Sequence, residues 1–145
     1  MKVLADSNVI LDVLLERTEH VVDSRQIWVA LEDDIVEGYL SAHCVTTIYY
    51  MMAKRAGRET ADELVSDLLS MCRIATVDQA VLAAASSWRW PDFEDAVTAS
   101  AAWEAGCDLI VTRDTAGFAK SKVKAMTPRA ALNHIRRSAS GRRRR

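Results

Sequence analysis

Residues 1–12 read Met-Lys-Val-Leu-Ala-Asp-Ser-Asn-Val-Ile-Leu-Asp, and this stretch decides the fold. Its first five residues have the composition of a short buried strand. The polar residues Asp6-Ser7-Asn8 are suited to cap the apolar helix that begins after them. We therefore expect a strand that passes through a polar turn directly into a helix. This alternation is typical of a parallel sheet covered by helices.

The same alternation continues along the chain. Amphipathic or alanine-rich segments predict helices over 20–36, 42–56, 58–72, 77–88 and 92–106, with Gly38 ending the first of them. Short apolar runs predict strands at 39–40, 73–76, 108–112 and 123–126, and Thr127-Pro128 begins a last helix. The predicted fold is an α/β three-layer sandwich, a central parallel sheet flanked by helices, over residues 1–137. Residues 138–145 are expected to form a basic flexible tail.

The composition indicates one globular domain with an uneven charge. The chain has 145 residues, of which 50% are hydrophobic, and only 5 Gly and 2 Pro, which argues against disorder and repeats. The net charge of −1 combines two opposite parts: residues 1–114 carry all 20 acids and 9 bases, whereas residues 115–145 carry 10 bases and no acid. Clustered carboxylates are suited to hold a cation, and a basic end is suited to meet a polyanion.

Three thiols, Cys44, Cys72 and Cys107, are widely spaced and form no C-x-x-C pair, so we expect small buried hydrophobic side chains rather than a zinc or redox site. Asp6 interrupts the N-terminal apolar run too early for a signal peptide. No apolar stretch approaches the roughly 18 residues of a membrane helix. We expect a soluble cytoplasmic protein with no membrane association.

Acidic residues from three separate segments are expected at one edge of the sheet. Asp6 follows the first strand, and Asp114 lies just beyond the apolar run 109–111. Asp92 and Asp95 share one face of a helix start, with Glu94 beside them. Like charges so close together need a cation, and oxygen ligands without His or Cys favour Mg²⁺ or Mn²⁺. Taken singly, each acid also has a structural explanation as a helix cap or turn residue; their joint placement favours function.

Other polar residues receive structural interpretations. His20, His43 and His134 lie away from the acidic segments in the sequence, and we expect them to be structural or on the surface. Asp12 is expected on the solvated surface, with an outer position at the acidic site as the alternative. Ser-His-Asp and Cys-His arrangements have no plausible candidates in this sequence.

Three segments of the chain resemble the main signatures of PIN domains: the opening M-K-V-L-A-D-S-N-V-I-L-D, the helix start P-D-F-E-D-A and the strand end L-I-V-T-R-D. More narrowly, they resemble VapC-type ribonuclease toxins of type II toxin–antitoxin pairs, in segment order and length over residues 1–135. The resemblance implies a PIN-like parallel sheet, a carboxylate cluster that binds Mg²⁺ or Mn²⁺, and cleavage of RNA. It also implies a cognate antitoxin protein as a partner and a homodimer formed through the early helices.

The resemblance assigns roles to individual residues. Asp6, Asp95 and Asp114 match the first, third and fourth acids, which hold the metal and are catalytic. Ser7 and Thr112 match small hydroxyl residues that orient those carboxylates, and Asp92 and Glu94 match further metal-binding acids of a subgroup with the string D-F-E-D. The sequence departs from the family at Thr47, which stands where a Glu is expected and leaves only a hydroxyl to support the site.

In the expected mechanism the metal activates a water that hydrolyses an RNA phosphodiester bond. Arg113, Lys120 and Lys122 are candidate RNA contacts, and the arginines of the C-terminal end are either further phosphate contacts or merely solubilising. The first alternative is a catalytically weak or inactive PIN-like module that binds RNA or a protein, as the departure at Thr47 suggests. A phosphotransfer domain, either a response-regulator receiver or a haloacid-dehalogenase-like phosphatase, is disfavoured. The phosphatase needs D-x-D and Asn8 occupies its second position, while the acidic pair and Lys of a receiver have no candidates.

Overall fold

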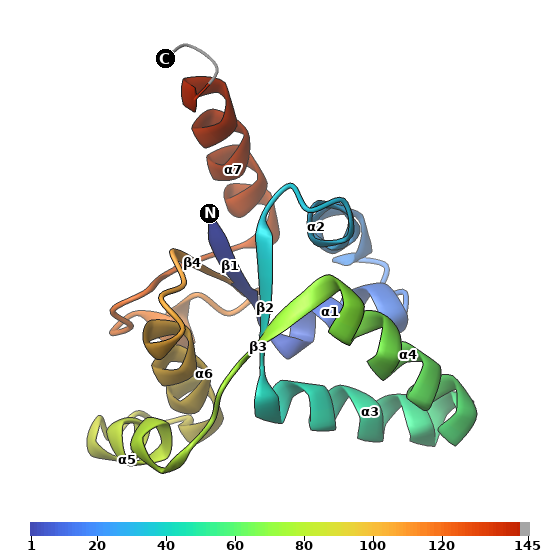
Figure 1. Cartoon of the computed structure of the whole chain (residues 1–145), viewed down its shortest axis with the longest axis horizontal. Coiled ribbons are helices and arrows are strands. Elements are labelled where there is room, and N and C mark those ends of the chain that lie inside the picture. The colour runs from blue at the N-terminus through green and yellow to red at the C-terminus, as the bar shows by residue number, and fades with distance from the viewer. Residues whose placement is uncertain (143–145) are drawn as a thin grey trace.

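A computed structural model describes residues 1–142 of the chain as a parallel sheet between two layers of helices (Figure 1). The sheet has five strands in the order β3-β2-β1-β4-β5. The strands are β1 (Lys2–Ala5), β2 (Glu37–Ser41), β3 (Cys72–Ala75), β4 (Leu109–Val111) and β5 (Lys124–Met126). The helices are α1 (Ser7–Leu14), α2 (Val21–Glu32), α3 (Ala42–Ala56), α4 (Arg58–Met71), α5 (Gln79–Ser87), α6 (Phe93–Glu104) and α7 (Pro128–Arg142), with a 3₁₀ turn η1 (Ala116–Phe118).

Strand β1 is the centre of the sheet and determines which loops meet. It pairs with β2 on one side, where Leu4 faces Tyr39, and with β4 on the other, where Ala5 faces Val111. The backbone hydrogen bonding between β1 and β4 continues one residue beyond β1, because the Asp6 amide donates to the Val111 carbonyl at 2.9 Å. The carboxyl ends of β1 and β4 therefore lie at the same edge, as the predicted convergence of the acids requires.

Side chains that alternate along each strand form two separate cores. Val3 and Ala5 pack with α1 to α4 and α7 on one face, and Leu4 packs with α5 and α6 on the other. In Figure 1, α5 and α6 lie on one side of the sheet and α1 to α4 on the opposite side. This arrangement confirms the predicted α/β three-layer sandwich.

Gly38 has a different role from the predicted one. It lies inside β2 and does not end the preceding helix, since α2 already ends at Glu32. A Cβ atom at position 38 would lie only 2.7 Å from Cδ2 of Leu31, so the absence of a side chain allows α2 to pack closely on the sheet. A glycine needed for close packing and a glycine that stops a helix cannot be distinguished by composition alone.

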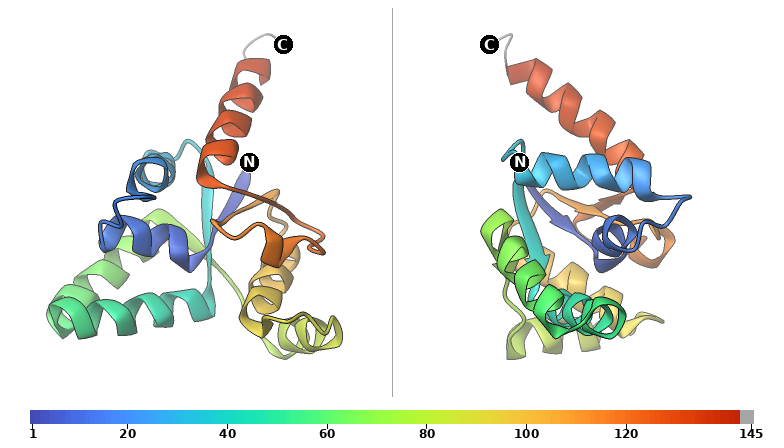
Figure 2. Two further views of the ribbon diagram at one scale, coloured as in Figure 1. Left: turned by 180° about the vertical axis from the view of Figure 1, so that it is seen from behind. Right: turned by 90° about the vertical axis from the view of Figure 1, so that its right-hand side faces the viewer.

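Helix α7 extends further than the sequence predicted and projects away from the body (Figure 2). It continues to Arg142, so the expected boundary at residue 137 falls inside the helix. Its exposed side is tied to α2 by an ion pair between Arg129 and Asp23 at 3.3 Å and a hydrogen bond from Arg136 to Gln26 at 3.1 Å. Residues 143–145 of the predicted tail lie outside the described part of the chain.

The three cysteines are free and buried, which confirms their prediction as small core residues. Burial raises the pKa of Cys44 far above its ordinary value, that of Cys72 to about 11 and that of Cys107 to about 12. Thiolates are therefore scarce at neutral pH. Within residues 1–142, no helix combines the length and the apolar character that crossing a membrane requires.

Candidate active site

Asp6 is the most firmly held acid at the carboxyl edge of the sheet. One carboxylate oxygen accepts from the Ser7 amide at 2.8 Å, and the other accepts from the Thr112 hydroxyl at 2.9 Å and from Asn8 Nδ2 at 3.1 Å. Burial raises the pKa of Asp6 above its ordinary value, and the hydrogen bond from Thr112 opposes that rise. Ser7 acts on Asp6 through its backbone, whereas Thr112 acts through its hydroxyl, as the resemblance implied.

Thr112 connects Asp6 to the loop that carries Asp114. The oxygen of its buried hydroxyl accepts from the Asp114 amide at 3.2 Å while its hydrogen is donated to Asp6. The Asp114 carboxylate in turn accepts from the Gly117 amide at 3.2 Å. Asn8, which sequence reasoning did not single out, accepts from the Arg113 amide at 3.4 Å and so links the turn after β1 to the turn after β4.

Asp95 reaches the same place from the first turn of α6. Asp92 caps this helix by accepting from the Asp95 amide at 3.0 Å, which confirms the helix-cap interpretation of that pair. A Cβ at Gly117 would lie 2.6 Å from Asp95 Oδ2 and 3.1 Å from Asp114 Oδ2, so both carboxylates face the same backbone position. Burial, followed by the negative charges of Asp92, Asp6, Asp114 and Glu94, raises the pKa of Asp95 to about 7.

The donor set at this edge fits a hard divalent cation. It consists of carboxylate oxygens whose charges disfavour one another's ionisation, which is the electrostatic condition that a bound cation relieves. The side chains are not arranged as a finished site, because among residues 1–142 no three Asp, Glu, His or Cys side chains lie close enough to hold a metal ion together. Asp6, Asp95 and Asp114 are the candidates to hold it, with the exposed Asp92 and Glu94 beside them.

His43 lies at this edge as well, so its predicted separation from the acidic segments is wrong. Its Nε2 is 3.2 Å from Thr98 Oγ1, and the charges of Asp6 and Glu94 act on its imidazole. Burial lowers the pKa of His43 in spite of those acids, which favours the neutral ring. Its Nδ1 is buried and has no hydrogen-bond partner among the described residues.

Thr47 stands one helical turn after His43 on the same face of α3, and this spacing was the signal that could have placed His43 at the site. The Thr47 hydroxyl donates to the His43 carbonyl at 3.2 Å. Helix α3 therefore offers the site an imidazole in place of the expected carboxylate, while the Thr47 hydroxyl is engaged by the backbone of its own helix.

Asp12 and Arg113 form an ion pair behind the site, which corrects the expected exposure of Asp12. Asp12 is 0% exposed instead of solvated, and its Oδ2 lies 2.8 Å from Arg113 Nε and 3.1 Å from the Ser24 hydroxyl. Arg17 approaches the other oxygen at 3.5 Å. The close Arg113 contact is an ion pair without hydrogen-bond alignment. The Arg113 side chain, which is 29% exposed, is thus engaged with Asp12, and the pair anchors the loop between Thr112 and Asp114.

Lys120 and Lys122, the other candidate RNA contacts, lie in different surroundings. Lys120 lines a cavity of about 390 Å³ together with Asp95 and Asp114. Lys122 instead places its ammonium group 5.0 Å from the ring centroid of Trp103. Of the two, Lys120 is the one that borders the carboxylates.

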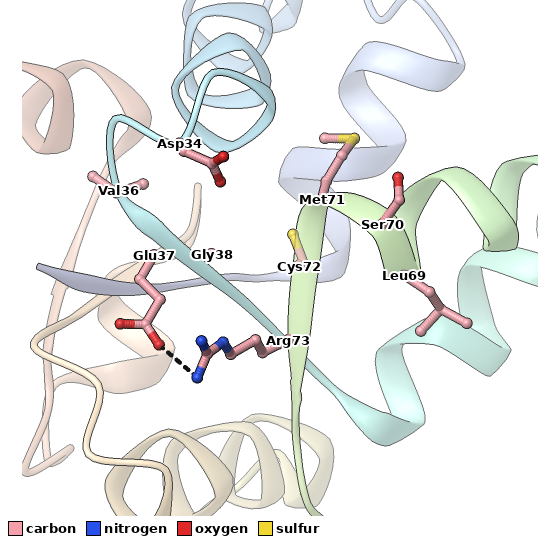
Figure 3. A pocket seen from close by; sticks show the side chains of 9 residues that line it. All are labelled: Asp34, Val36, Glu37, Gly38, Leu69, Ser70, Met71, Cys72 and Arg73. Carbon is pink, nitrogen blue, oxygen red and sulfur yellow. Dashed lines mark ion pairs between the residues drawn. The ribbon is translucent and has the colours of Figure 1, made fainter.

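A separate cavity of about 310 Å³ opens at the amino ends of β2 and β3, opposite the edge that carries the acids (Figure 3). Glu37 and Arg73 pair across its mouth at 3.2 Å, and Glu37 also accepts from the Tyr39 hydroxyl at 3.1 Å. Two of its three charged side chains, Glu37 and Arg73, satisfy one another, whereas several carboxylates act on one another at the carboxyl edge, which is the stronger candidate for chemistry.

The profile of the family described as PIN domain matches residues 2–116. Solved structures with this fold include a toxin–antitoxin complex from Klebsiella pneumoniae, 19% identical with a TM-score of 0.66, covering 87% of this chain and 97% of that one. FitAcB from Neisseria gonorrhoeae is 24% identical with a TM-score of 0.66, covering 87% and 97% of the two chains. The Sarcin-Ricin loop cleaving toxin VapC20 of Mycobacterium tuberculosis is 15% identical with a TM-score of 0.61, covering 74% and 86%.

A search of curated proteins found no match. At these identities the structural similarities establish the fold, and the profile establishes the family. Because its match spans most of the sequence and includes the segments that carry Asp6, Asp95 and Asp114, the chain belongs to the PIN domain family.

Proposed function

We propose that this protein is a metal-dependent endoribonuclease and the toxin of a toxin–antitoxin pair. The observation that carries the proposal is the convergence of Asp6, Asp95 and Asp114 from three separate segments on one edge of the sheet, where burial and the neighbouring negative charges raise the pKa of Asp95 to about 7. Family membership supports it, as do structural neighbours that include a toxin–antitoxin complex and a Sarcin-Ricin loop cleaving toxin. A negative cluster of this kind repels a phosphodiester unless a cation lies between them.

The residues of the chain prepare the site before any ion arrives. Asp6 is fixed by hydrogen bonds from Ser7, Asn8 and Thr112, so its oxygens keep one orientation. Asp114 is held through Gly117 and through the contact of its own amide with Thr112. Asp6, Asp95 and Asp114 would hold Mg²⁺ or Mn²⁺, which would supply a water of lowered pKa and neutralise charge on the attacked phosphate. Because the pKa of Asp95 is raised to about 7, its carboxyl group would have to lose its proton in order to hold the ion.

The charged residues around the carboxylates indicate how the RNA substrate is held. Lys120 borders the carboxylates and is suited to contact a phosphate next to the scissile one. Arg113 does not contribute directly, because it is engaged with Asp12. The basic residues of α7 add sequence-independent attraction that weakens with salt.

The test is Mg²⁺-dependent cleavage of a single-stranded RNA by the purified protein and by Asp6→Asn. Asparagine keeps the size of Asp6 and removes the charge, so we expect cleavage to fall by at least about 100-fold while the melting temperature remains close to that of the wild type. Asp62→Asn, which neutralises an exposed acid on α4, is the matched control and should cleave normally. Full activity of Asp6→Asn would remove the assignment.

We further propose a cognate antitoxin as the partner, a homodimer as the assembly and the cytoplasm as the location. The antitoxin rests on neighbours solved as toxin–antitoxin complexes. Co-expression with a small protein encoded next to this chain should yield a stable complex in which RNA cleavage is suppressed. Sedimentation of the isolated chain at twice its 16.1 kDa mass would support the dimer.

One observation favours a second candidate, a catalytically weak module that binds RNA or protein. Helix α3 supplies no carboxylate at Thr47, whose hydroxyl is already bonded to His43. Titration calorimetry separates the two functions, because the nuclease should bind Mg²⁺ or Mn²⁺ in a manner abolished by Asp6→Asn, whereas the weak module should give no heat with either protein.

A further inference from the structure

The cavity beside the carboxylates has an apolar half that the hydrolysis itself does not use. Asp95, Asp114 and Lys120 form one part of its wall, and Trp90, Pro91 and Ala119 form another. Its volume of about 390 Å³ lies within the range of roughly 300–1,000 Å³ that small-molecule sites occupy. Asp92 also lines the polar half, so its three carboxylates outweigh the charge of Lys120 and would accept an anionic group only through a cation bound among them. With that cation, a ligand that fits both halves has a flat apolar part joined to an anionic part.

Trp90 is held in place by other aromatic rings. Its centroid is 5.4 Å from that of Trp88 with the planes inclined by 34°, and 6.3 Å from that of Phe118 with the planes at 90°. Phe118 is only 3% exposed and belongs to the core between the sheet and α6. Stacked and edge-on contacts of this kind restrain a ring, so little conformational freedom remains for Trp90 to lose on binding.

The backbone connects Trp90 directly to the acids. Arg89 adopts a left-handed conformation with φ of 56° just after α5, which turns the chain between the two tryptophans. Pro91 follows Trp90, and Asp92 then caps the helix that carries Asp95. The position of the indole relative to Asp95 is therefore set by a short and constrained segment.

We propose that Trp90 is a stacking platform for an unpaired base of the RNA substrate, next to the phosphate that a cation at Asp95 and Asp114 would bind. This inference rests on the proposed ribonuclease function and specifies its substrate class. A nucleotide has the required combination of a flat base and an anionic phosphate, and aromatic side chains stack on bases that are splayed out of a strand. A base inside a duplex is already stacked and paired, so the platform selects single strands, loops and bulges over duplex RNA.

The test compares Trp90→Leu with Trp90→Phe and with Trp103→Leu. Leucine keeps apolar volume without a π-face, and phenylalanine keeps a smaller ring. Trp103 is a 50% exposed tryptophan near the other end of α6, outside the cavity. Binding of a short fluorescein-labelled oligoadenylate is recorded by stopped-flow anisotropy with Mg²⁺ present, before cleavage occurs. Melting temperatures and far-UV circular dichroism establish that each variant is folded.

We expect Trp90→Leu to weaken binding of the single strand by about 5- to 150-fold, the range of base stacking on an aromatic side chain. Trp90→Phe should retain most of the affinity, and Trp103→Leu and the binding of duplex RNA should be unchanged. An oligonucleotide with one abasic position, moved along the strand, tests the same contact from the side of the RNA. At one position it should weaken wild-type binding and leave Trp90→Leu binding unaffected.

The stacking role of Trp90 would be overturned if wild type and Trp90→Leu bound the single strand with equal affinity. It would also be overturned if the abasic position weakened the binding of both proteins by the same factor. The two proposals fail in different ways. Cleavage that needs Asp6 but ignores Trp90 removes the platform alone. Binding that needs Trp90 in a protein that does not cleave RNA removes the nuclease and retains the platform.

Discussion

The ion pair of Asp12 and Arg113 provides the sharpest test of how burial determines what a charge pair contributes to the free energy of unfolding. Replacing Arg113 with alanine leaves the carboxylate of Asp12, which is 0% exposed, without its closest cation at 2.8 Å. Removing one partner of a buried pair costs about 3–5 kcal/mol, because the remaining charge stays desolvated. Ser24 at 3.1 Å and Arg17 at 3.5 Å remain near Asp12, and the Arg113 side chain is 29% exposed, so the lower end of that range applies. We expect the free energy of unfolding to fall by about 3 kcal/mol.

The assay is urea unfolding, with Arg129→Ala as the matched control. Arg129 also pairs with an aspartate, Asp23 at 3.3 Å, but its side chain is 79% exposed, so its loss should cost at most about 1 kcal/mol. The urea midpoint of Arg113→Ala should fall with an unchanged slope, and its melting temperature should drop by on the order of 10 °C. Equal losses for Arg113→Ala and Arg129→Ala would refute the reasoning, since burial is the only physical basis for the difference.

Three further outcomes follow from the site and the core. A Cβ atom added by Gly117→Ala would lie 2.6 Å from a carboxylate oxygen of Asp95 and 3.1 Å from one of Asp114, so both carboxylates should be displaced. We expect calorimetry to show that the affinity for Mg²⁺ falls at least about 10-fold. Gly141→Ala is the control, because open space surrounds Gly141, and it should leave the affinity unchanged. Because the folded pKa of Asp95 is raised to about 7 from 3.8, the native state retains a proton that the unfolded state has released, and stability should fall as pH rises from about 4 to 7. We therefore expect urea unfolding in the presence of a chelator to show that Asp95→Asn is more stable than the wild type at pH 8. Its free energy of unfolding should be higher by on the order of 1 kcal/mol once solvent screening is allowed for, and this difference should vanish at pH 4. Finally, Cys44, Cys72 and Cys107 should resist a thiol reagent at pH 8 in the native protein and react within minutes in urea; rapid native labelling would contradict their burial.

The fold was accessible to sequence reasoning because its signals are local. Apolar runs of three to five residues followed by caps such as Asp6 and Thr127 place strands and helix starts within a residue or two of their positions. The order of the strands is not local, yet the convergence of Asp6 with Asp114 depended only on β1 and β4 being neighbours. Gly38 was misinterpreted because the close approach of Leu31, a tertiary contact, is the reason for that glycine.

The supporting contacts of the site could not be predicted in the same way. Asp12 pairs with Arg113, about 100 positions away, and neither residue differs in type from an ordinary surface charge. His43 joins the site because the start of α3 brings its ring beside Thr98 of α6, a tertiary contact that the helical period of α3 does not indicate. Sequence patterns therefore identified the acids at the site better than the residues that hold or surround them.

Helix capping and metal binding were opposed explanations of the acids in the sequence, and in the structure they are compatible. Asp92 caps α6 and thereby sets the first turn from which Asp95 faces Gly117 and Asp114. Asp6 accepts hydrogen bonds from Ser7, Asn8 and Thr112, which disperse its charge, whereas the pKa of Asp95 is raised by burial and four neighbouring carboxylates. Ionisation is therefore strongly disfavoured at Asp95, at the wall of the cavity that also contains Trp90 and Lys120. A cation that stabilises the ionised carboxylate of Asp95 would attract the phosphate of a strand to that wall, beside the aromatic surface on which its base can stack.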